Sequence, residues 1–422
     1  MSAEGNYYRA TANAFPTQSR LIGEIECDVA VLGGGFTGTS AALAAAETGA
    51  RVILLEAETI GFGASGRNGG QLIPGLRWTA RELIAAFGLD RARAIHGLAM
   101  DAANRVKARI ARHAIACDLA PGHLEAAHKP SHFTQMRDEV ELLTTRFGRT
   151  GLELVAPADI RRLVATDAYH GGVFDRDGGH FHPLNYVRGL AAAALAAGAS
   201  IHEHSRVSAI ADNGSTVRVT TAQGSVIAAQ AILAADAWTG DIVPALGRFT
   251  VPLMNYVIAT APLGDLARKL LPTNAAIADS RFVLNYFRLS ADGRLIFGGG
   301  ERYRSAPPRD IGAFVRPHIT RLFPDLATIP IEFGWEGTVS VTMNRLPQVG
   351  RRGNILYAHG FSGHGALLTT LAGELLAEAA AGPSPNFDLL AGLPHRLFPG
   401  GKLMARPLAT LGLLYYAMKD RL

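Results

Sequence analysis

The residues with the clearest chemical signature form a run of glycines near the N-terminus. Gly33, Gly35 and Gly38 make the pattern G-x-G-x-x-G, which follows the short run CDVAVL and opens an Ala-rich helical stretch. The first glycine permits a tight turn, the second lets a pyrophosphate approach the backbone, and the third lets helix and strand pack closely. Glu56 ends the next strand about 20 residues later, where a carboxylate accepts hydrogen bonds from ribose hydroxyls and repels a 2′-phosphate. The pattern predicts an adenine dinucleotide other than NADP, the alternative being a glycine-rich turn without a ligand.

A second glycine loop, GFGASGRNGGQ at 61–71, lies directly after the strand that ends at Glu56. Its five glycines are more than a nicotinamide enzyme needs, and they suit a backbone that lies against a flat tricyclic ring. The alternative is a flexible surface loop.

A third glycine-rich turn, GFSGHG at 360–365, precedes a long helical pattern. Such a turn directs backbone N–H groups and the positive end of the helix dipole outward. A flavin needs this beside its N1–C2=O edge, because two-electron reduction leaves negative charge there. The alternative is an ordinary helix start capped by Ser362.

Four of the 14 histidines are the better candidates for chemistry, namely His180, His182, His359 and His364. No spacing argument identifies any of them as a base. His359 and His364 are not spaced as a metal-binding pair on a helix, and no carboxylate cluster completes a site, so no metal is expected.

The elements that must position these residues begin with a βαβ unit, which implies a doubly wound parallel sheet with its ligand at the carboxyl ends of the strands. Further strands and an Ala-rich helix indicate that the chain leaves this sheet and returns to it, and alternating segments predict a second, mainly antiparallel layer over the cofactor. The expected strands are 27–32, 51–56, 200–204, 207–210, 217–221, 225–234, 251–260, 282–289, 294–298 and 355–357, and the expected helical stretches are 39–48, 79–150, 184–197 and 366–381.

Composition narrows the class of protein. With 48% apolar and 18% charged residues in a chain of 422, a disordered protein is excluded. The net charge is +5 without a basic run, so nucleic acid is not an expected partner. Cys27 and Cys117 are too few for a disulfide framework, which indicates a reducing compartment and a cytoplasmic location.

Neither end of the sequence resembles a membrane span. The first 24 residues lack the basic and apolar regions of a secretory signal and are expected to form a surface arm. The apolar segment 407–418 (PLATLGLLYYAM) is too short to cross a bilayer. It would either dock on the core as a terminal helix or make a peripheral membrane contact.

Five stretches in order along the chain resemble the D-amino-acid oxidase superfamily of FAD-dependent oxidoreductases, and more closely its γ-glutamylputrescine oxidase-like branch. They are GASGRNGGQ at 63–71, GGHFHPLN at 178–185, NRLPQVGR at 344–351, GFSGHG at 360–365 and PHRLFPGG at 394–401. The resemblance implies an α/β fold, α+β overall, in which a discontinuous Rossmann-like FAD-binding domain (25–78, 179–240 and 340–383) joins a mainly antiparallel β substrate domain with helices (79–178 and 241–339). A C-terminal tail, 384–422, would follow.

The resemblance also implies which residues bind FAD. The ADP half would lie against the first glycine turn and Glu56, the adenine near Val207, the isoalloxazine along the second glycine loop, and the pyrimidine edge at the third. The cofactor-binding set is Gly33, Gly35, Phe36, Thr37, Gly38, Glu56, Ala57, Ser65, Gly66, Arg67, Asn68, Gly69, Gly70, Gln71, Val207, Gly360, Ser362, Gly363, His364 and Gly365. Neither cysteine lies near the loop at 360–365, so FAD is expected to be non-covalent. One departure is ADAW at 235–238, where relatives more often carry a Gly-Asn pair.

The leading hypothesis is an FAD-dependent oxidase of a primary or secondary amine. A hydride would pass from the carbon beside nitrogen to flavin N5, the imine would be hydrolysed to an aldehyde, and O2 would be reduced to H2O2. His364, His182 and Arg288 are the catalytic candidates. A dehydrogenase that passes electrons from an amine or amino acid to a quinone, a flavin-binding protein without turnover, and an NAD-dependent dehydrogenase are the alternatives.

The expected substrate class depends on one position. The stretch 335–350 is similar to the one in which glycine oxidase-like relatives carry W-x-G-x-R-P, whose arginine pairs with the substrate α-carboxylate, and here that position is Val339. A buried carboxylate without a partner costs several kcal/mol, so an α-amino acid should bind poorly and an amine such as a polyamine derivative should bind better. A distal carboxylate would meet Arg288 or Arg345. The alternative is that another arginine, such as Arg302, replaces the missing one.

Overall fold

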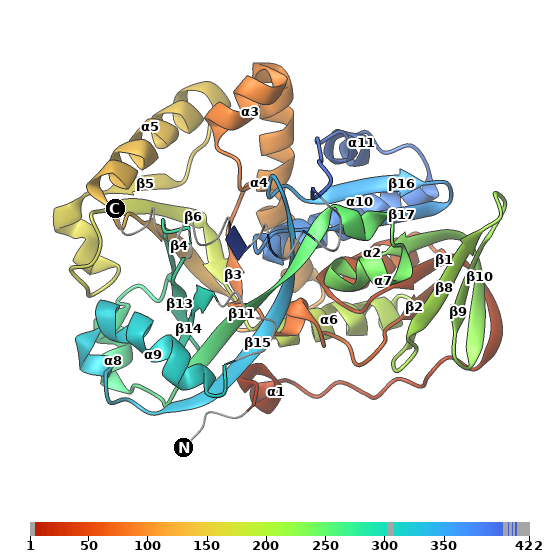
Figure 1. The fold of residues 1–422 in the computed structure, drawn as a ribbon, viewed down its shortest axis with the longest axis horizontal. Coiled ribbons are helices and arrows are strands. Elements are labelled where there is room, and N and C mark those ends of the chain that lie inside the picture. The colour runs from red at the N-terminus through yellow and green to blue at the C-terminus, as the bar shows by residue number, and fades with distance from the viewer. Residues whose placement is uncertain are drawn as a thin grey trace.

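The computed structural model describes residues 5–282, 284–301 and 308–399, together with the single positions 404, 407, 410 and 411. The described strands form two large sheets that lie side by side, one of eight strands and one of nine (Figure 1). Among the described residues, no helix is both long and apolar enough to cross a membrane. Apart from positions 407, 410 and 411, the segment considered for a membrane contact lies outside the described residues.

The eight-stranded sheet has the order β16-β17-β10-β1-β2-β7, and the β8–β9 hairpin extends β10. From β17 to β7 the neighbouring strands run parallel. All four residues of β2 are buried, as expected for a parallel strand covered on both faces. Its strands are β1 (Gly23–Leu32), β2 (Val52–Leu55), β7 (Ser200–His202), β8 (Val207–Asp212), β9 (Val217–Thr221), β10 (Gly224–Leu233), β16 (Gln348–Arg352) and β17 (Ile355–His359).

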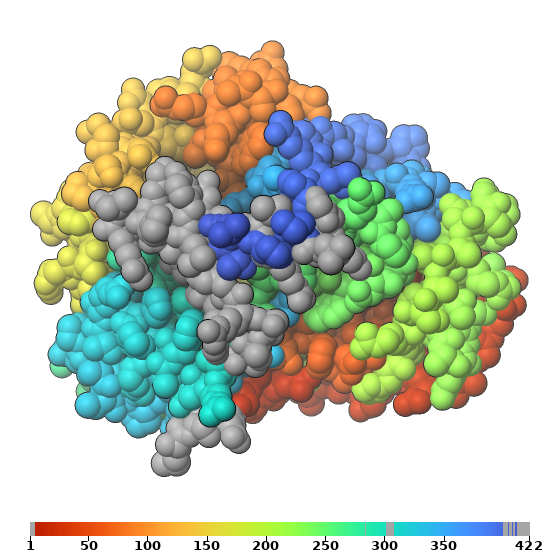
Figure 2. Space-filling model, in the orientation of Figure 1, coloured from red at the N-terminus to blue at the C-terminus, as the bar shows by residue number. Residues whose placement is uncertain are grey.

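Small residues let three helices pack closely beside this sheet. Helix α2 (Phe36–Glu47) contacts both α6 (Pro183–Ala196) and α10 (Gly365–Ala381). A Cβ at Gly373 of α10 would lie 2.4 Å from the Thr37 carbonyl oxygen, so only glycine allows this approach. Helix α4 (Leu89–Arg112), in orange, packs against α10 and α11 (Pro385–Ala391), in blue (Figure 2).

The nine-stranded sheet has the order β15-β11-β14-β13-β12-β4-β6-β3, with β5 beside β6. It is antiparallel except where β4 pairs with β12. Helix α9 (Ile311–Leu322) packs on β11, β14 and β15. The strands are β3 (Gln71–Leu72), β4 (Ala120–Ala126), β5 (Leu152–Val155), β6 (Gly172–His180), β11 (Thr250–Thr260), β12 (Ala276–Asp279), β13 (Tyr286–Leu289), β14 (Leu295–Glu301) and β15 (Ile331–Thr342), and the other helices are α1 (Tyr7–Thr11), α3 (Ala80–Phe87), α5 (Pro130–Phe147), α7 (Thr239–Ile242) and α8 (Asp265–Leu270).

The expected fold class, a Rossmann-like α/β unit with a mainly antiparallel second sheet, is confirmed by this arrangement. The division of the chain at 78, 178, 240, 339 and 383 stays a prediction. Two elements connect the predicted segments: β3, from 25–78, pairs with β6 in the nine-stranded sheet, and α4, from 79–178, packs on α10.

The N-terminal segment is only in part the surface arm expected from the sequence: most of residues 9–24 are exposed, but α1 docks on the core. Helix α1 buries Tyr7 and Tyr8, which are 4% and 0% exposed. The Tyr7 hydroxyl donates to Asp292 Oδ1 over 2.7 Å, and the Tyr8 hydroxyl accepts from Arg288 Nη2 over 3.1 Å. Both partners lie far away in the sequence, so no local pattern around the two tyrosines revealed this docking.

The stretch 79–150 is not continuously helical as expected. Strand β4 interrupts it between α4 and α5. Its sequence, APGHLEA, contains no β-branched residue, and the strand is held instead by pairing with β6 on one side and β12 on the other. Tertiary pairing here overrides a weak local propensity.

Candidate functional site

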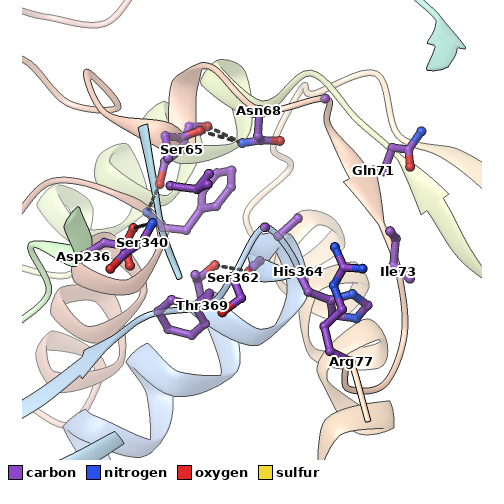
Figure 3. Close-up of a pocket in the computed structure, with 18 of the residues that line it drawn as sticks. Ser65, Asn68, Gln71, Ile73, Arg77, Asp236, Ser340, Ser362, His364 and Thr369 are labelled. Atoms are coloured by element: carbon purple, nitrogen blue, oxygen red, sulfur yellow. Dashed lines mark hydrogen bonds between the residues drawn. The ribbon is translucent and has the colours of Figure 1, made fainter. Parts of the chain in front are cut away.

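A cavity of about 820 Å³, which we call the central cavity, receives its lining from both sheets. One side is formed where β1, β2 and β10 end, at Leu32, Leu55 and Ala234. The other side is formed by residues of β4, β6, β11, β12, β13 and β15. Figure 3 shows how side chains from the glycine loops and from the start of α10 surround it.

The first glycine turn opens onto the central cavity at the N-terminus of α2. Gly33, Gly35, Phe36 and Thr37 line it, whereas Gly38 lies behind them. A Cβ at Gly38 would lie 1.8 Å from the Gly33 carbonyl oxygen, so the third glycine serves the close packing of helix and strand. A Cβ at Gly35 would lie 2.8 Å from Ser65 Oγ, which accepts a hydrogen bond from the Phe36 N–H. A side chain at Gly35 would therefore disturb the second glycine loop as well as the space in front of the turn.

Glu56 lies at the end of β2 and lines the central cavity with Ala57 and Val207. Its carboxylate accepts from the Gly34 N–H over 2.6 Å and from the Glu58 N–H over 2.9 Å. Burial raises the pKa of this carboxyl, and the two backbone donors oppose that shift. Each oxygen keeps a second lone pair for a ribose hydroxyl.

The second glycine loop is held by its own polar side chains. Asn68 donates to the carbonyl oxygens of Ala64 and Ser65, both over 3.0 Å, and accepts from the Gly70 N–H over 2.7 Å. The loop thus presents Ser65, Asn68 and Gly69 to the cavity, and these hydrogen bonds fix its shape.

Gln71 and Arg67 tie this loop to the nine-stranded sheet. The Gln71 side-chain amide donates to the carbonyl oxygen of Ile277 over 2.8 Å, and Arg67 Nη1 donates to that of Glu336 over 3.1 Å. Both residues line the cavity. Gly66 and Gly70 lie outside its lining and act in packing, because a Cβ would lie 2.1 Å and 2.2 Å, respectively, from a carbonyl oxygen.

The third glycine turn brings Ser362, Gly363, His364 and Gly365 to the cavity, with Gly360 just behind. Ser362 and Gly363 have left-handed backbone angles, with φ of 55° and 75°. This geometry leads the chain directly into α10, whose first turn faces the cavity.

His364 lies beside Arg77 in the wall of the cavity (Figure 3). Its Nε2 is 3.2 Å from the Gly75 carbonyl oxygen, to which a neutral imidazole donates. Burial, and then the Arg77 guanidinium, lowers the pKa of His364 to about 3. The imidazole is therefore neutral near pH 7 and accepts a proton only weakly, and its catalytic role stays a prediction.

His182 and Arg288, the other two catalytic candidates, do not line the central cavity. His182 caps α6, where its Nδ1 accepts from the Asn185 N–H over 3.1 Å. Arg288 donates to the carbonyl oxygens of Gly69 and Leu289, over 2.7 and 3.0 Å, and to the Tyr8 hydroxyl. The catalytic role expected of these two side chains stays a prediction. Arg288 holds the loop at Gly69.

The other arginines considered as partners for a substrate carboxylate are Arg345 and Arg302. Arg345 stacks over the Phe282 ring at 3.8 Å and does not line the cavity. Arg302 lies outside the described residues.

The predicted cofactor-binding residues that line the cavity fit FAD. A turn without side chains at the end of β1, a carboxylate at the end of β2, and two further glycine loops all border one cavity of about 820 Å³. The described part of the chain holds no group of three or more residues arranged to bind a metal ion. Both cysteines are free and buried, and neither lines the cavity.

Asp236 is a residue of the site that the sequence reasoning did not assign. Its carboxylate lines the cavity and accepts from the N–H groups of Gly360, over 2.9 Å, and Ser340, over 3.3 Å. It joins three segments that are distant in sequence, and its backbone has a φ of 40°. The only signal was that 235–238 departs from the pattern of relatives.

Side chains from the nine-stranded sheet were also missed. His123 and Glu125 of β4, Asn255 of β11 and Tyr286 of β13 line the cavity, as does Arg77 from the loop before α3. No spacing rule connects them, because strands that are distant in the sequence bring them together.

Comparison with known proteins agrees with this geometry. The family model described as FAD dependent oxidoreductase (DAO) matches residues 28–379. The chain is similar to gamma-glutamylputrescine oxidoreductase of Escherichia coli (strain K12), with 41% identity over 99% of this chain and 98% of the relative. It is 37% identical to a probable oxidoreductase of Rhizobium meliloti (strain 1021), over 99% of this chain and 97% of that one.

Solved structures show the same fold at lower identity. Glycine oxidase from Geobacillus kaustophilus has a TM-score of 0.72 at 19% identity, covering 86% of this chain and 96% of its own. L-Proline dehydrogenase from P. horikoshii has a TM-score of 0.70 at 20% identity, covering 85% and 93%. The family model and the relative at 41% identity show that the chain belongs to the D-amino-acid oxidase family of FAD-dependent oxidoreductases, in the branch of gamma-glutamylputrescine oxidoreductase.

Proposed function

We propose that this protein is an FAD-dependent oxidase of a primary or secondary amine of the γ-glutamylputrescine type. The amine would be oxidised to an imine, water would hydrolyse the imine to an aldehyde, and O2 would be reduced to H2O2. The relative at 41% identity is named for γ-glutamylputrescine, which supports this substrate class.

The observation that carries the proposal is the position of Val339. This residue of β15 lines the central cavity, paired with Leu253 of β11. The neighbouring Gly337 and Ser340 also line the cavity and carry no charge. Arg67 lies next to Gly337, but its guanidinium donates to the carbonyl oxygens of Phe62 and Glu336. An α-carboxylate beside Val339 would lose its water without a cation dedicated to it, whereas an uncharged carbon beside the amine would not.

The chain's own groups suit a neutral amine. FAD, when bound, supplies the acceptor for the hydride. Burial lowers the pKa of His123 to about 4, so that this imidazole, like His364, is neutral near pH 7. Neutral imidazoles can accept a hydrogen bond from an amine N–H, and the sheet face that lines the cavity would orient the C–H bond.

The test is an anaerobic panel of reductants followed at the flavin absorbance. Putrescine and its γ-glutamyl conjugate should bleach the flavin faster than glycine, sarcosine or D-alanine. A faster reduction by any of the three α-amino acids would overturn the assignment of Val339.

Oxygen consumption then separates an oxidase from a dehydrogenase. With the best amine, the oxidase should consume O2 and form H2O2 without an added acceptor. Turnover that requires a quinone analogue would assign the protein to the dehydrogenases instead.

A further inference from the structure

Strand β4 places a carboxylate on the cavity side of the nine-stranded sheet. Along β4, His123 and Glu125 are two residues apart and both line the central cavity, as alternation in a strand requires. Glu125 pairs across the sheet with Ala278 of β12 and with Val173 of β6. Neither neighbour carries a charge, and both also line the cavity.

Glu125 differs from the other carboxylates around this cavity. Among the described residues, no hydrogen bond or ion pair joins its carboxylate to another group, and the side chain is exposed to the cavity that it lines. The other cavity-lining carboxylates each have a partner: Glu56, Glu58, Glu139, Asp175, Asp236, Asp241 and Asp279.

The charges that face Glu125 are of both signs. Burial raises the pKa of its carboxyl, Arg77 opposes that shift, and Glu139 adds to it. Arg77 also lies beside His364 at the third glycine turn, and its charge acts on both His364 and Glu125. The cavity thus runs from the neutral imidazole of His364 to an unpartnered acid on the sheet.

We propose that Glu125 binds a second, cationic nitrogen of the substrate, separate from the nitrogen beside the oxidised carbon. This inference rests on the proposed function, and the group that Glu125 recognises is the ammonium at the far end of the substrate. In a diamine this is the second amine, and in the γ-glutamyl conjugate, where that nitrogen is an uncharged amide, it is the α-ammonium of the glutamyl group. The reacting amine must be neutral, but an alkylammonium has a pKa near that of lysine and stays protonated in water. An ammonium bound next to Glu125 would give the carboxylate a charged hydrogen-bond partner, which would offset the loss of water by both groups.

The substitution Glu125→Gln tests this with little change of shape. In anaerobic flavin reduction, the half-saturating concentration of 1,4-diaminobutane should rise about 10- to 100-fold in Glu125→Gln, as expected for loss of a charged hydrogen bond. The limiting reduction rate should change much less. For butylamine, which has no second nitrogen, both values should be unaffected. An equal effect on the two amines, or none on the diamine, would overturn the inference.

Glu141→Gln is the matched control, because Glu141 is exposed on α5 and does not line the cavity. It removes the same charge and should leave the discrimination between the two amines as in the unsubstituted protein. A shift equal to that of Glu125→Gln would show a general charge effect and would refute binding by Glu125.

Calorimetric titration of the holoenzyme under anaerobic conditions gives a readout independent of turnover. If no amine reduces the flavin, the proposed function fails, yet tight diamine binding that Glu125→Gln weakens would still support the cation site. Absence of diamine binding to the unsubstituted holoenzyme, or equal binding to both proteins, would overturn it.

Discussion

The glycines of this protein differ in what a methyl group would meet, and the difference predicts opposite effects of the same substitution. Gly38→Ala would place Cβ 1.8 Å from a backbone carbonyl oxygen, so it should lower the free energy of unfolding by more than about 2 kcal/mol and impair FAD retention. Gly97 lies inside α4, and a Cβ added there would have no atom within 4 Å. Gly97→Ala should therefore raise the free energy of unfolding by about 0.5–1 kcal/mol. Urea unfolding measures both, and equal shifts of the two variants would contradict the packing described for α2.

Asp236 predicts a pH dependence of stability. Burial raises the pKa of this carboxyl from 3.8 to about 6, against the pull of its backbone donors. The unfolded chain releases this proton at a lower pH than the folded protein does. The free energy of unfolding therefore falls as pH rises from about 4 to 6, by at most about 3 kcal/mol from this group.

Asp236→Asn removes that titration. As pH rises from about 4 to 6, the unsubstituted protein should lose unfolding free energy relative to the variant. Above about pH 7 the difference between the two proteins should stay constant. Parallel pH profiles in urea unfolding would show that Asp236 does not titrate in this window.

At the scale of an element, α1 stabilises the second glycine loop through Arg288. Tyr8 is fully buried and holds Arg288, which in turn holds the carbonyl oxygen of Gly69. Tyr8→Ala should lower the free energy of unfolding by about 3–5 kcal/mol and weaken FAD binding, whereas Tyr8→Phe keeps the ring and should cost about 1 kcal/mol. Thermal unfolding and FAD release followed by fluorescence measure the two effects.

Ala10→Gln is the control on the same helix, since Ala10 is exposed. It should change stability by less than about 0.5 kcal/mol. If Tyr8→Ala were as mild as this control, α1 would have no supporting role.

At the scale of the whole molecule, the cavity joins the two sheets, and a cofactor bound there should stabilise both. FAD added to the stripped protein at 100 times its dissociation constant should raise the free energy of unfolding by about 2.7 kcal/mol. Because neither cysteine lines the cavity, denaturation should release all of the FAD into solution. Colour that stays with the precipitated chain would instead indicate a covalent bond.

Some features of this protein could be predicted from the sequence because their physical requirements are local. The turn at Gly33–Gly35 needs residues without side chains next to a strand and a helix, and Glu56 needs only to end the following strand. The parallel sheet, the Ala-rich helices and the class of cofactor follow from such short-range patterns. The glycine turn before α10 belongs with them, since its backbone geometry depends on a few consecutive residues.

Other features were decided only by the tertiary structure. Arg288 and Tyr8 are 280 residues apart, and only the folded chain shows that they bind each other. His182 looked like a flavin-facing histidine and caps a helix instead, because an imidazole can accept a backbone N–H as readily as a substrate proton. Glu125 carried no signal in its short strand. Its place on the cavity wall depends on pairing with strands from elsewhere in the chain, and the energy of such contacts depends on which distant groups the fold brings to each side chain.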